Sequence, residues 1–100
     1  MIAVIFEVTL KEGKADRYFD LAAELRPERA GVDGILSVER FESLATPGKF
    51  LSLSFWRDAE ALAAWREHAG HRDAQELGKA ELFADFRIRV AQVDRDYGPQ

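Results

Sequence analysis

The sequence predicts an α+β fold with the element order β-α-β-β-α-β, in which two helices cover one face of an antiparallel sheet. Segments that alternate apolar and polar residues, as strands do, stand at both ends of the chain and on either side of a central turn signal. Two segments with helical apolar spacing separate these strands. We expect residues 1–100 to form a single domain, because a chain of this length holds one hydrophobic core.

The first two expected elements are a strand and a helix. Residues 3–10 alternate apolar and polar side chains, which predicts a strand. Residues 14–25 have apolar positions, Tyr18 among them, on one helical stripe. Pro27 should end or kink this helix at Arg26, because proline disfavours the helical conformation in the residue before it.

A hairpin is expected in the middle of the chain. Residues 35–42 form its first strand, and a change of apolar phase between Val38 and Phe41 suggests a bulge. The Thr-Pro-Gly sequence at 46–48 is a turn signal, since proline presets one central position and glycine can take positive φ at the next. Residues 50–56 then return as an antiparallel strand.

The second half of the fold begins at Asp58, a good N-cap for a helix that Gly70 interrupts. Residues 71–83 can form a further helical segment. Residues 85–96 form the last expected strand, and the remaining four residues are a tail. This order of elements is the split-βαβ, or ferredoxin-like, arrangement.

Strand alternation assigns side chains to the two faces of the sheet. The residues expected under the helices are Val4, Phe6, Val8, Leu51, Leu53, Phe55, Phe86, Ile88 and Val90. The residues expected on the opposite face are Ile5, Glu7, Ile35, Glu39, Phe50, Ser52, Ser54, Trp56, Arg87, Arg89, Ala91 and Val93. This second face is too apolar to be left in water. It predicts a homodimer whose interface includes charge pairs among Glu7, Glu39, Arg87 and Arg89.

Composition excludes several classes of partner. The net charge of −4 and the interleaving of acids with bases argue against a nucleic-acid or membrane surface. The chain has no cysteine, which fits a cytoplasmic protein and removes thiolate chemistry. The apolar N-terminus has no basic flank or cleavage site, so we expect it to be part of the core.

Acid–base chemistry is most plausible between residues 54 and 75, which hold both tryptophans and both histidines. His68 follows Trp65 by three residues and shares part of its helical face. A histidine there could take a proton from a phenol, or it could be a solvated residue at a helix C-terminus. His71 could equally be catalytic or structural. The HxxH spacing lacks convergent acidic ligands, so no metal is expected.

Aromatic residues could form the walls of an apolar pocket. Tyr18 and Phe83 would face Phe6 and Phe55 across it, with Trp65 as a stacking surface. The alternative for each of these side chains is ordinary core packing. Motifs for nucleotide binding, serine hydrolysis and zinc proteolysis do not occur in the sequence.

Several stretches carry a family resemblance. The strand end SFW, the helix end AWREH, the following HRDAQ and the final FRIRVAQVDRDYG resemble the antibiotic biosynthesis monooxygenase domain proteins. The resemblance implies a dimeric α/β barrel with a small-molecule pocket between sheet and helices in each subunit. Characterised members of such families include monooxygenases that oxidise polycyclic phenols or quinols with dioxygen and without metal or flavin. Related members degrade haem.

The haem-degrading members provide a test of this sequence. Their asparagine, tryptophan and iron-ligating histidine correspond to Phe6, Trp65 and Gln75, so only the tryptophan matches. His71, one helical turn before Gln75, could replace the ligand, but the Gly70 break leaves its direction open. Haem binding is therefore disfavoured. The leading hypothesis is a cofactor-independent monooxygenase of small aromatic molecules, with His68 or His71 as base, Trp65 as ring platform and Tyr18 as hydrogen-bond partner. The alternative is a non-catalytic dimer that binds a small molecule.

Overall fold

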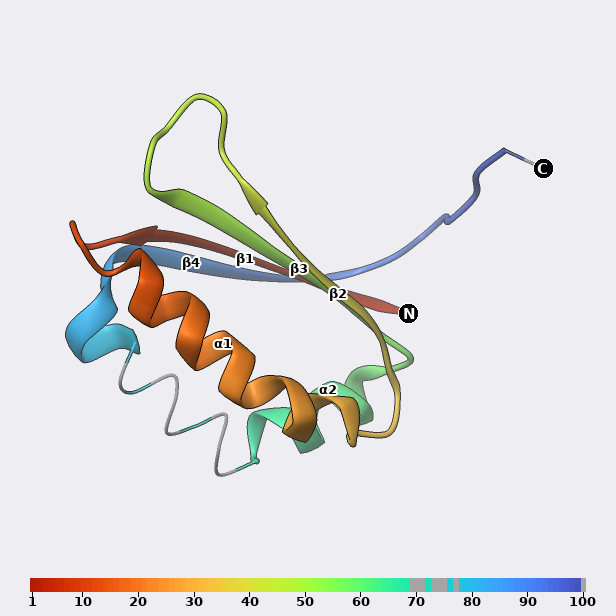
Figure 1. Ribbon diagram of the computed structural model, residues 1–100. Helices are drawn as coiled ribbons and strands as arrows, with labels where there is room; N and C mark the ends of the chain where they lie inside the picture. The colour runs from red at the N-terminus through yellow and green to blue at the C-terminus, as the bar shows by residue number, and fades with distance from the viewer. Residues whose placement is uncertain (69–71, 73–75, 77, 100) are drawn as a thin grey trace.

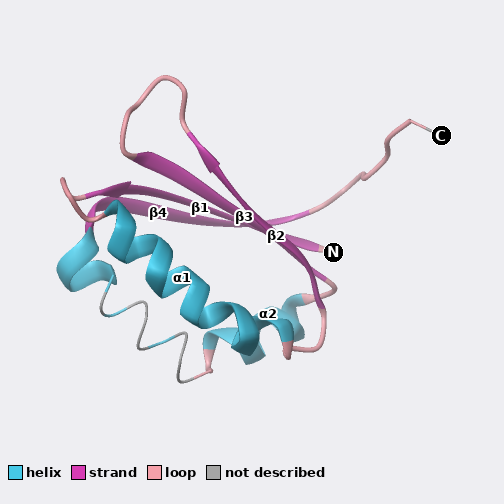
Figure 2. Ribbon diagram, in the orientation of Figure 1, coloured by secondary structure: helices cyan, strands magenta, loops and turns pink. Residues whose placement is uncertain are grey.

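A computed structural model describes residues 1–68, 72, 76 and 78–99 of the chain. Its elements are β1 (Ile2–Leu10), α1 (Ala15–Ala30), β2 (Ile35–Glu42), β3 (Lys49–Trp56), α2 (Ala59–Arg66), the π-helical turn η1 (Gly78–Leu82) and β4 (Phe83–Gln92). The strands pair antiparallel in the order β2-β3-β1-β4. Both helices lie on the same face of this sheet (Figures 1 and 2), which confirms the predicted fold class. We call the face under the helices the inner face and the other the outer face.

The boundaries of helix α1 and strand β4 differ from the predictions. Helix α1 continues to Ala30, so Pro27 does not end it at Arg26, which was one of the two effects expected of this proline. Proline removes one backbone donor and disfavours the helical conformation before it, but it does not forbid a further helical turn. Strand β4 begins at Phe83, where Leu10 pairs with it after a register shift, and it ends at Gln92 rather than at residue 96.

The predicted cap and turn are confirmed. Asp58 has extended backbone angles and its Oδ1 accepts a hydrogen bond from the Ala61 N–H at 2.9 Å, so it caps α2. Between β2 and β3, the Lys49 N–H donates to the Thr46 carbonyl at 3.2 Å, and Gly48 adopts a φ of 80°. The helical segment expected at 71–83 lies largely outside the described residues, and its described end is η1.

The assignment of β3 to the two faces was wrong. Val8 pairs with Phe50 and Ile2 pairs with Trp56, so both aromatic residues lie on the inner face. Trp56 is 2% exposed and Phe50 is 8% exposed. The alternate residues therefore lie on the outer face, namely Leu51, Leu53 and Phe55. The outer phase is apolar from Leu51 to Phe55, whereas the inner phase holds two serines between Phe50 and Trp56, so alternation alone favoured the wrong face. Burial of the Trp56 and Phe50 rings selects the other one.

A bulge near the start of β2 corrects a second face assignment. Ile35 pairs with Trp56 and Ser37 pairs with Phe55, which leaves Leu36 as the extra residue. Ile35 consequently lies on the inner face, contrary to the prediction. The bulge was expected further along the strand, but its consequence is the same, because it resets which side chains of β2 face the helices.

The core has two parts. The α1 cluster consists of Val8, Leu10, Tyr18, Phe50 and Leu82, and partly buried Phe6 and Phe83 pack against it. The α2 cluster consists of Trp56, Ala61, Leu62 and Trp65, and partly buried Val4 and Ile35 pack against it. The two clusters approach each other along β1, since Val4 and Phe6 are successive inner-face residues about 7 Å apart.

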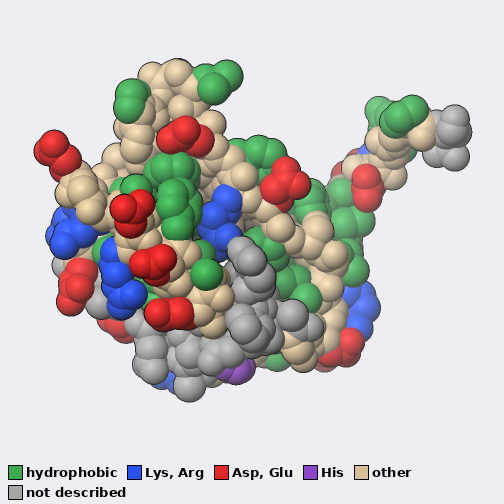
Figure 3. Space-filling view, in the orientation of Figure 1, with side chains coloured by type: hydrophobic (Ala, Val, Ile, Leu, Met, Phe, Trp, Pro, Cys, Tyr) green, Lys and Arg blue, Asp and Glu red, His purple; other side chains and the backbone are tan. Residues whose placement is uncertain are grey.

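The surface agrees with the mixed charge of the sequence. In Figure 3, acidic and basic side chains are interleaved on the face that carries α1. Beyond β4 the chain leaves the body of the molecule (Figure 1), and Tyr97 there is largely exposed. Within the described ranges, no helix has the length and apolar character needed to cross a membrane.

Candidate functional site

The register of the sheet builds the inner face from transverse rows of side chains. One row runs from β2 to β4 as Arg40, Ser52, Phe6 and Ile88. The next row is Val38, Ser54, Val4 and Val90. The two rows lie where the α1 cluster meets the α2 cluster. They form the floor of the candidate site, which is mostly polar on β2 and β3 and apolar on β1 and β4.

Three of the predicted pocket residues meet at the α1 end of this floor. Tyr18 is 6% exposed, and its ring lies 6.0 Å from that of Phe83 in an edge-on arrangement. The Phe83 ring lies 5.6 Å from that of Phe6. Aromatic pairs at these separations and tilts stabilise one another beyond the area they bury. Tyr18, Phe6 and Phe83 therefore form one continuous aromatic wall.

The other predicted pair meets at the α2 end. Helix α2 ends at Arg66, and His68 lies just beyond it with its N–H donating to the Trp65 carbonyl at 3.0 Å. This turn places the imidazole of His68 against the indole of Trp65, with ring centroids 5.2 Å apart and planes inclined by 30°. Trp65 is buried in the α2 cluster, whereas His68 is only partly buried. Its imidazole is thus held against a buried ring and remains accessible.

Not all of the predicted site residues belong to this arrangement. Phe55 pairs with Ala3 and Ser37 and so lies on the outer face, where it cannot line a space under the helices. The reason is the reversed phase of β3. His71 and Gln75 lie outside the described residues.

The helices leave part of the apolar floor exposed. Phe86, Ile88 and Val90 project from β4 on the inner face, and they are 38%, 41% and 53% exposed. β4 is an edge strand, so these side chains have neighbours on one side only. Exposed apolar residues next to a buried aromatic wall are typical of a surface that receives an apolar molecule.

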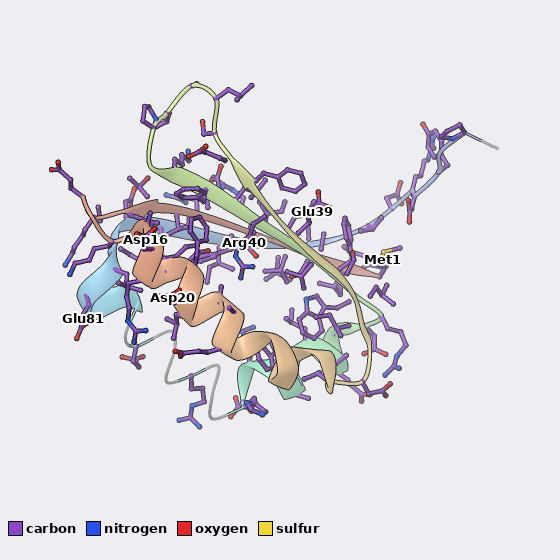
Figure 4. The ribbon with its side chains drawn as sticks, in the orientation of Figure 1. Met1, Asp16, Asp20, Glu39, Arg40 and Glu81 are labelled. Atoms are coloured by element: carbon purple, nitrogen blue, oxygen red, sulfur yellow. The ribbon has the colours of Figure 1, made fainter. Side chains whose placement is uncertain are left out.

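Polar side chains on the inner face were missed or misplaced by the sequence interpretation. Ser54 was expected on the outer face, but its Oγ accepts a hydrogen bond from the Trp56 indole N–H at 2.9 Å. Arg40 was not considered at all. Its guanidinium lies 5.8 Å from the centroid of the Tyr18 ring, under the sheet on the side of α1 (Figure 4). Residue 40 is two positions after Val38 on β2, so strand alternation could have placed Arg40 on the same face as Val38.

Charges gather on the outer face instead. The Arg89 guanidinium donates to Glu7 at 2.7 Å, and the Lys49 Nζ lies 3.8 Å from the other oxygen of Glu7. The hydrogen bond from Arg89, with the charge of Lys49 after it, lowers the pKa of the Glu7 carboxyl. A cavity of about 130 Å³ lies here, lined by Glu7, Thr9, Lys49, Asp85, Phe86 and Arg87. Glu7 and Arg89 were predicted to form a pair, and they do so within one chain.

A metal centre finds no support in the described part of the chain. Among residues 1–68, 72, 76 and 78–99, no group of three or more histidine, aspartate or glutamate side chains could hold a metal ion. The candidate site on the inner face combines aromatic walls, a partly buried imidazole and a guanidinium.

Comparison with known sequences identifies related proteins. The family model described as antibiotic biosynthesis monooxygenase matches residues 1–77. A jasmonate monooxygenase named ABM, from Pyricularia oryzae, is 46% identical over 93 residues, which are 93% of this chain and 43% of the relative. The chain thus spans less than half of that relative's length. Protein YqjZ of Bacillus subtilis, which is uncharacterised, is 31% identical over 93 residues, covering 93% of this chain and 79% of the relative.

Comparison with solved structures supports the fold. A candidate antibiotic biosynthesis monooxygenase from Deinococcus radiodurans superposes with a TM-score of 0.86 at 19% identity, over 100% of this chain and 99% of the other. A conserved protein from Methanosarcina mazei Go1 superposes with a TM-score of 0.83 at 19% identity, over 91% and 90% of the two chains. At these identities the likeness concerns the arrangement of the backbone alone.

Proposed function

The chain belongs to the antibiotic biosynthesis monooxygenase family, and we propose that it is a cofactor-independent monooxygenase that oxidises a small electron-rich aromatic molecule with dioxygen. The observation that carries the proposal is the stacking of His68 on Trp65, which belongs to the α2 cluster against which Val4 of the floor packs. A planar substrate placed there would have both an aromatic surface and a proton acceptor within reach of its ring.

The reaction balances without an added reductant. His68 removes a proton from a phenol or from an activated ring CH₂, and the resulting anion gives electrons to dioxygen. In an anthrone, one oxygen atom becomes the new carbonyl oxygen, and the other leaves as water with both hydrogens of the oxidised CH₂. In a quinol, one oxygen atom enters the ring as a hydroxyl group while the ring becomes a quinone, and the other leaves as water with two of the quinol's hydrogens. The substrate is oxidised and dioxygen is reduced, so no metal or organic cofactor is needed.

The remaining residues have supporting roles in this proposal. Phe6 and Phe83 orient the ring and exclude water, which matters because the anion must be held close to dioxygen. The Tyr18 hydroxyl is a hydrogen-bond donor for the developing oxyanion. His71 is the second candidate base.

Jasmonate is a second candidate substrate, because the 46% identical relative is named a jasmonate monooxygenase. Hydroxylation at a saturated carbon follows a different electron count. It consumes two electrons and two protons in addition to the substrate and dioxygen. A jasmonate hydroxylase would therefore need an external reductant of the nicotinamide type, whereas oxidation of a quinol would not.

The outer face supports a homodimer. Leu51, Leu53 and Phe55 lie there together with Ile5, and no helix in the described part of the chain covers them. Phe41 on the same face is 43% exposed. Two outer faces packed together would bury this apolar area around the charges of Glu7 and Arg89.

Oxygen consumption tests the proposal. We expect the wild-type protein to consume dioxygen with an anthrone or a quinol and to do so without a nicotinamide cofactor. His68→Ala should lose this uptake. Uptake of dioxygen with jasmonate only when a reduced nicotinamide is present would favour the second candidate. Saturable binding of ring compounds without any oxygen uptake would instead favour a non-catalytic binding protein.

A further inference from the structure

Arg40 occupies an unusual position for a charged residue. It projects from β2 on the inner face, and Figure 4 shows it between the sheet and α1. The register places Ser52 beside it, then Phe6 and then Ile88 on the far strand. The cation thus lies under the helix layer, in the same row as the exposed apolar floor.

The guanidinium of Arg40 lacks the partner that its position calls for. Its Nε is buried and has no hydrogen-bond acceptor. No carboxylate within the described part of the chain forms an ion pair with it. Arg57 and Arg89, in contrast, each bond to an acid. The Tyr18 ring, 5.8 Å away, offers only a cation–π contact.

An unbonded buried donor is unfavourable, because it has lost water without gaining an acceptor. A guanidinium presents its donors in a planar fork, and a carboxylate matches two of them at once. The chemistry of Arg40 therefore fits an acceptor that comes from outside the chain. A carboxylate is the simplest group of that kind.

The rest of the row describes the body of such a ligand. Neighbouring strands are about 4.8 Å apart, so the three strand spacings from Arg40 to Ile88 span roughly 14 Å. Ser52 adds a hydroxyl next to the cation, and beyond it Phe6 and Ile88 are apolar. A molecule with one acidic end and an apolar ring or chain would match this row from end to end.

We propose that Arg40 binds the carboxylate of the substrate, and that the preferred substrates of this site are amphipathic monocarboxylic acids. This inference rests on the proposed function, since it concerns the same inner face. It makes Arg40 a specificity-determining residue that orients the apolar body of the molecule along Phe6 and Ile88. Recognition of the acid and oxidation of the ring remain separable steps.

Binding of an acid and its methyl ester tests this role. The probes are jasmonic acid and methyl jasmonate, measured by calorimetry and by the fluorescence of Trp56 and Trp65. The wild type should bind the acid at least about 10-fold more tightly than the ester, the lower end expected for a charged hydrogen bond. Arg40→Gln should weaken binding of the acid to the level of the ester and leave binding of the ester unchanged. The affinity of Arg40→Lys for the acid should fall between those of the wild type and Arg40→Gln, because lysine keeps the charge but loses the planar fork of donors.

Arg17→Gln is the matched control, since Arg17 is exposed on α1 and pairs with Glu24. It should bind both probes as the wild type does. Circular dichroism establishes that each variant is folded. If Arg40→Gln does not fold, Arg40→Lys still tests the role of Arg40. Equal binding of acid and ester by the wild type, equal weakening of both by Arg40→Gln, or no binding of either probe would overturn the proposal.

These outcomes differ from those that test the oxidation itself. A preference for the acid without any oxygen uptake would contradict the monooxygenase proposal and leave the role of Arg40 standing. Oxygen uptake with uncharged anthrones, combined with equal binding of acid and ester, would contradict the role of Arg40 alone.

Discussion

The imidazole of His68 stacks on the indole of Trp65, with 5.2 Å between ring centroids and 30° between ring planes. Helix α2 ends two residues before His68, and the N–H of His68 still donates to the Trp65 carbonyl, which turns its ring back onto the helix. The stack connects a buried core residue to a partly buried titratable one. It thereby gives the histidine a fixed orientation that an exposed helix end would not provide.

Replacement of His68 separates its two roles. His68→Phe keeps an aromatic ring against Trp65 but removes the proton acceptor, whereas His68→Ala removes both. If His68 is the base, kcat should fall by about 100-fold or more in both variants, the usual contribution of a general base. Oxygen uptake under saturating substrate is the measurement. Activity retained by His68→Phe but lost by His68→Ala would mean that the ring packs against substrate and that the base lies elsewhere.

Adjacent residues on β3 should respond differently to mutation because they lie on opposite faces. Trp56→Ala removes a fully buried ring that accounts for much of the α2 cluster, so the free energy of unfolding should fall by about 3–5 kcal/mol in urea denaturation. Phe55→Glu places a charge on the outer face and should shift a dimer toward monomer in sedimentation velocity.

Ala63→Glu serves as the control for Phe55→Glu, since Ala63 is exposed on α2 in the helix layer. It adds the same charge away from the outer face and should leave the sedimentation coefficient unchanged. A wild-type protein that sediments as a monomer at micromolar concentration would remove the dimer proposal. Strong destabilisation by both Ala63→Glu and Phe55→Glu would instead indicate a general effect of charge.

Two glycines with similar backbone angles differ in their surroundings. Gly34 has a φ of 93°, and a Cβ there would meet the Ala61 side chain at the start of α2. Gly13 has a φ of 78° and open space around it. Gly13→Ala should cost about 1 kcal/mol of stability from backbone strain alone. Gly34→Ala should cost roughly 1–3 kcal/mol more, because the helix must shift. Equal effects in thermal unfolding would show that the contact with Ala61 is readily relieved.

The cap of α2 should make stability depend on pH. The hydrogen bond from the Ala61 N–H, with the Arg57 guanidinium after it, lowers the pKa of the Asp58 carboxyl below its ordinary value. A lowered folded pKa means that this stabilisation is complete above the unfolded value near pH ~3.9 and is lost as the pH falls through the folded value. Asp58→Ala should therefore lower Tm at pH 7 and have a progressively smaller effect in acid.

Asp58→Asn is the control for this pH dependence. Asparagine can still accept the hydrogen bond from Ala61 but carries no titrating charge. The difference in Tm between Asp58→Asn and Asp58→Ala should stay nearly constant as the pH is lowered. The difference in Tm between the wild type and Asp58→Ala should shrink. A difference between wild type and Asp58→Ala that does not change from pH 7 to pH 2 would contradict the assigned cause.

The local features of the fold could be predicted well from the sequence. The turn at Gly48 and the cap at Asp58 depend on a few neighbouring residues, whose backbone preferences and side-chain acceptors are fixed by residue type. The proximity of Trp65 and His68 was expected from their spacing of three residues, although the turn after α2 and not a continuing helix brings the two rings together. The end of α1 was predicted less well, because a proline biases a helix boundary without determining it.

The amino-acid sequence by itself determined the family, the order of elements and the pairing of Trp65 with His68, since each depends on local pattern or on recognisable motifs. Only the tertiary structure decided which phase of β3 faces the helices and that Arg40 lies between the sheet and α1. The physical reason is that a strand's alternation has a period of two but no intrinsic inside. Pairing with Ile2 and Val8, and the burial of Trp56 and Phe50, select the face, and that choice removes Phe55 from the site.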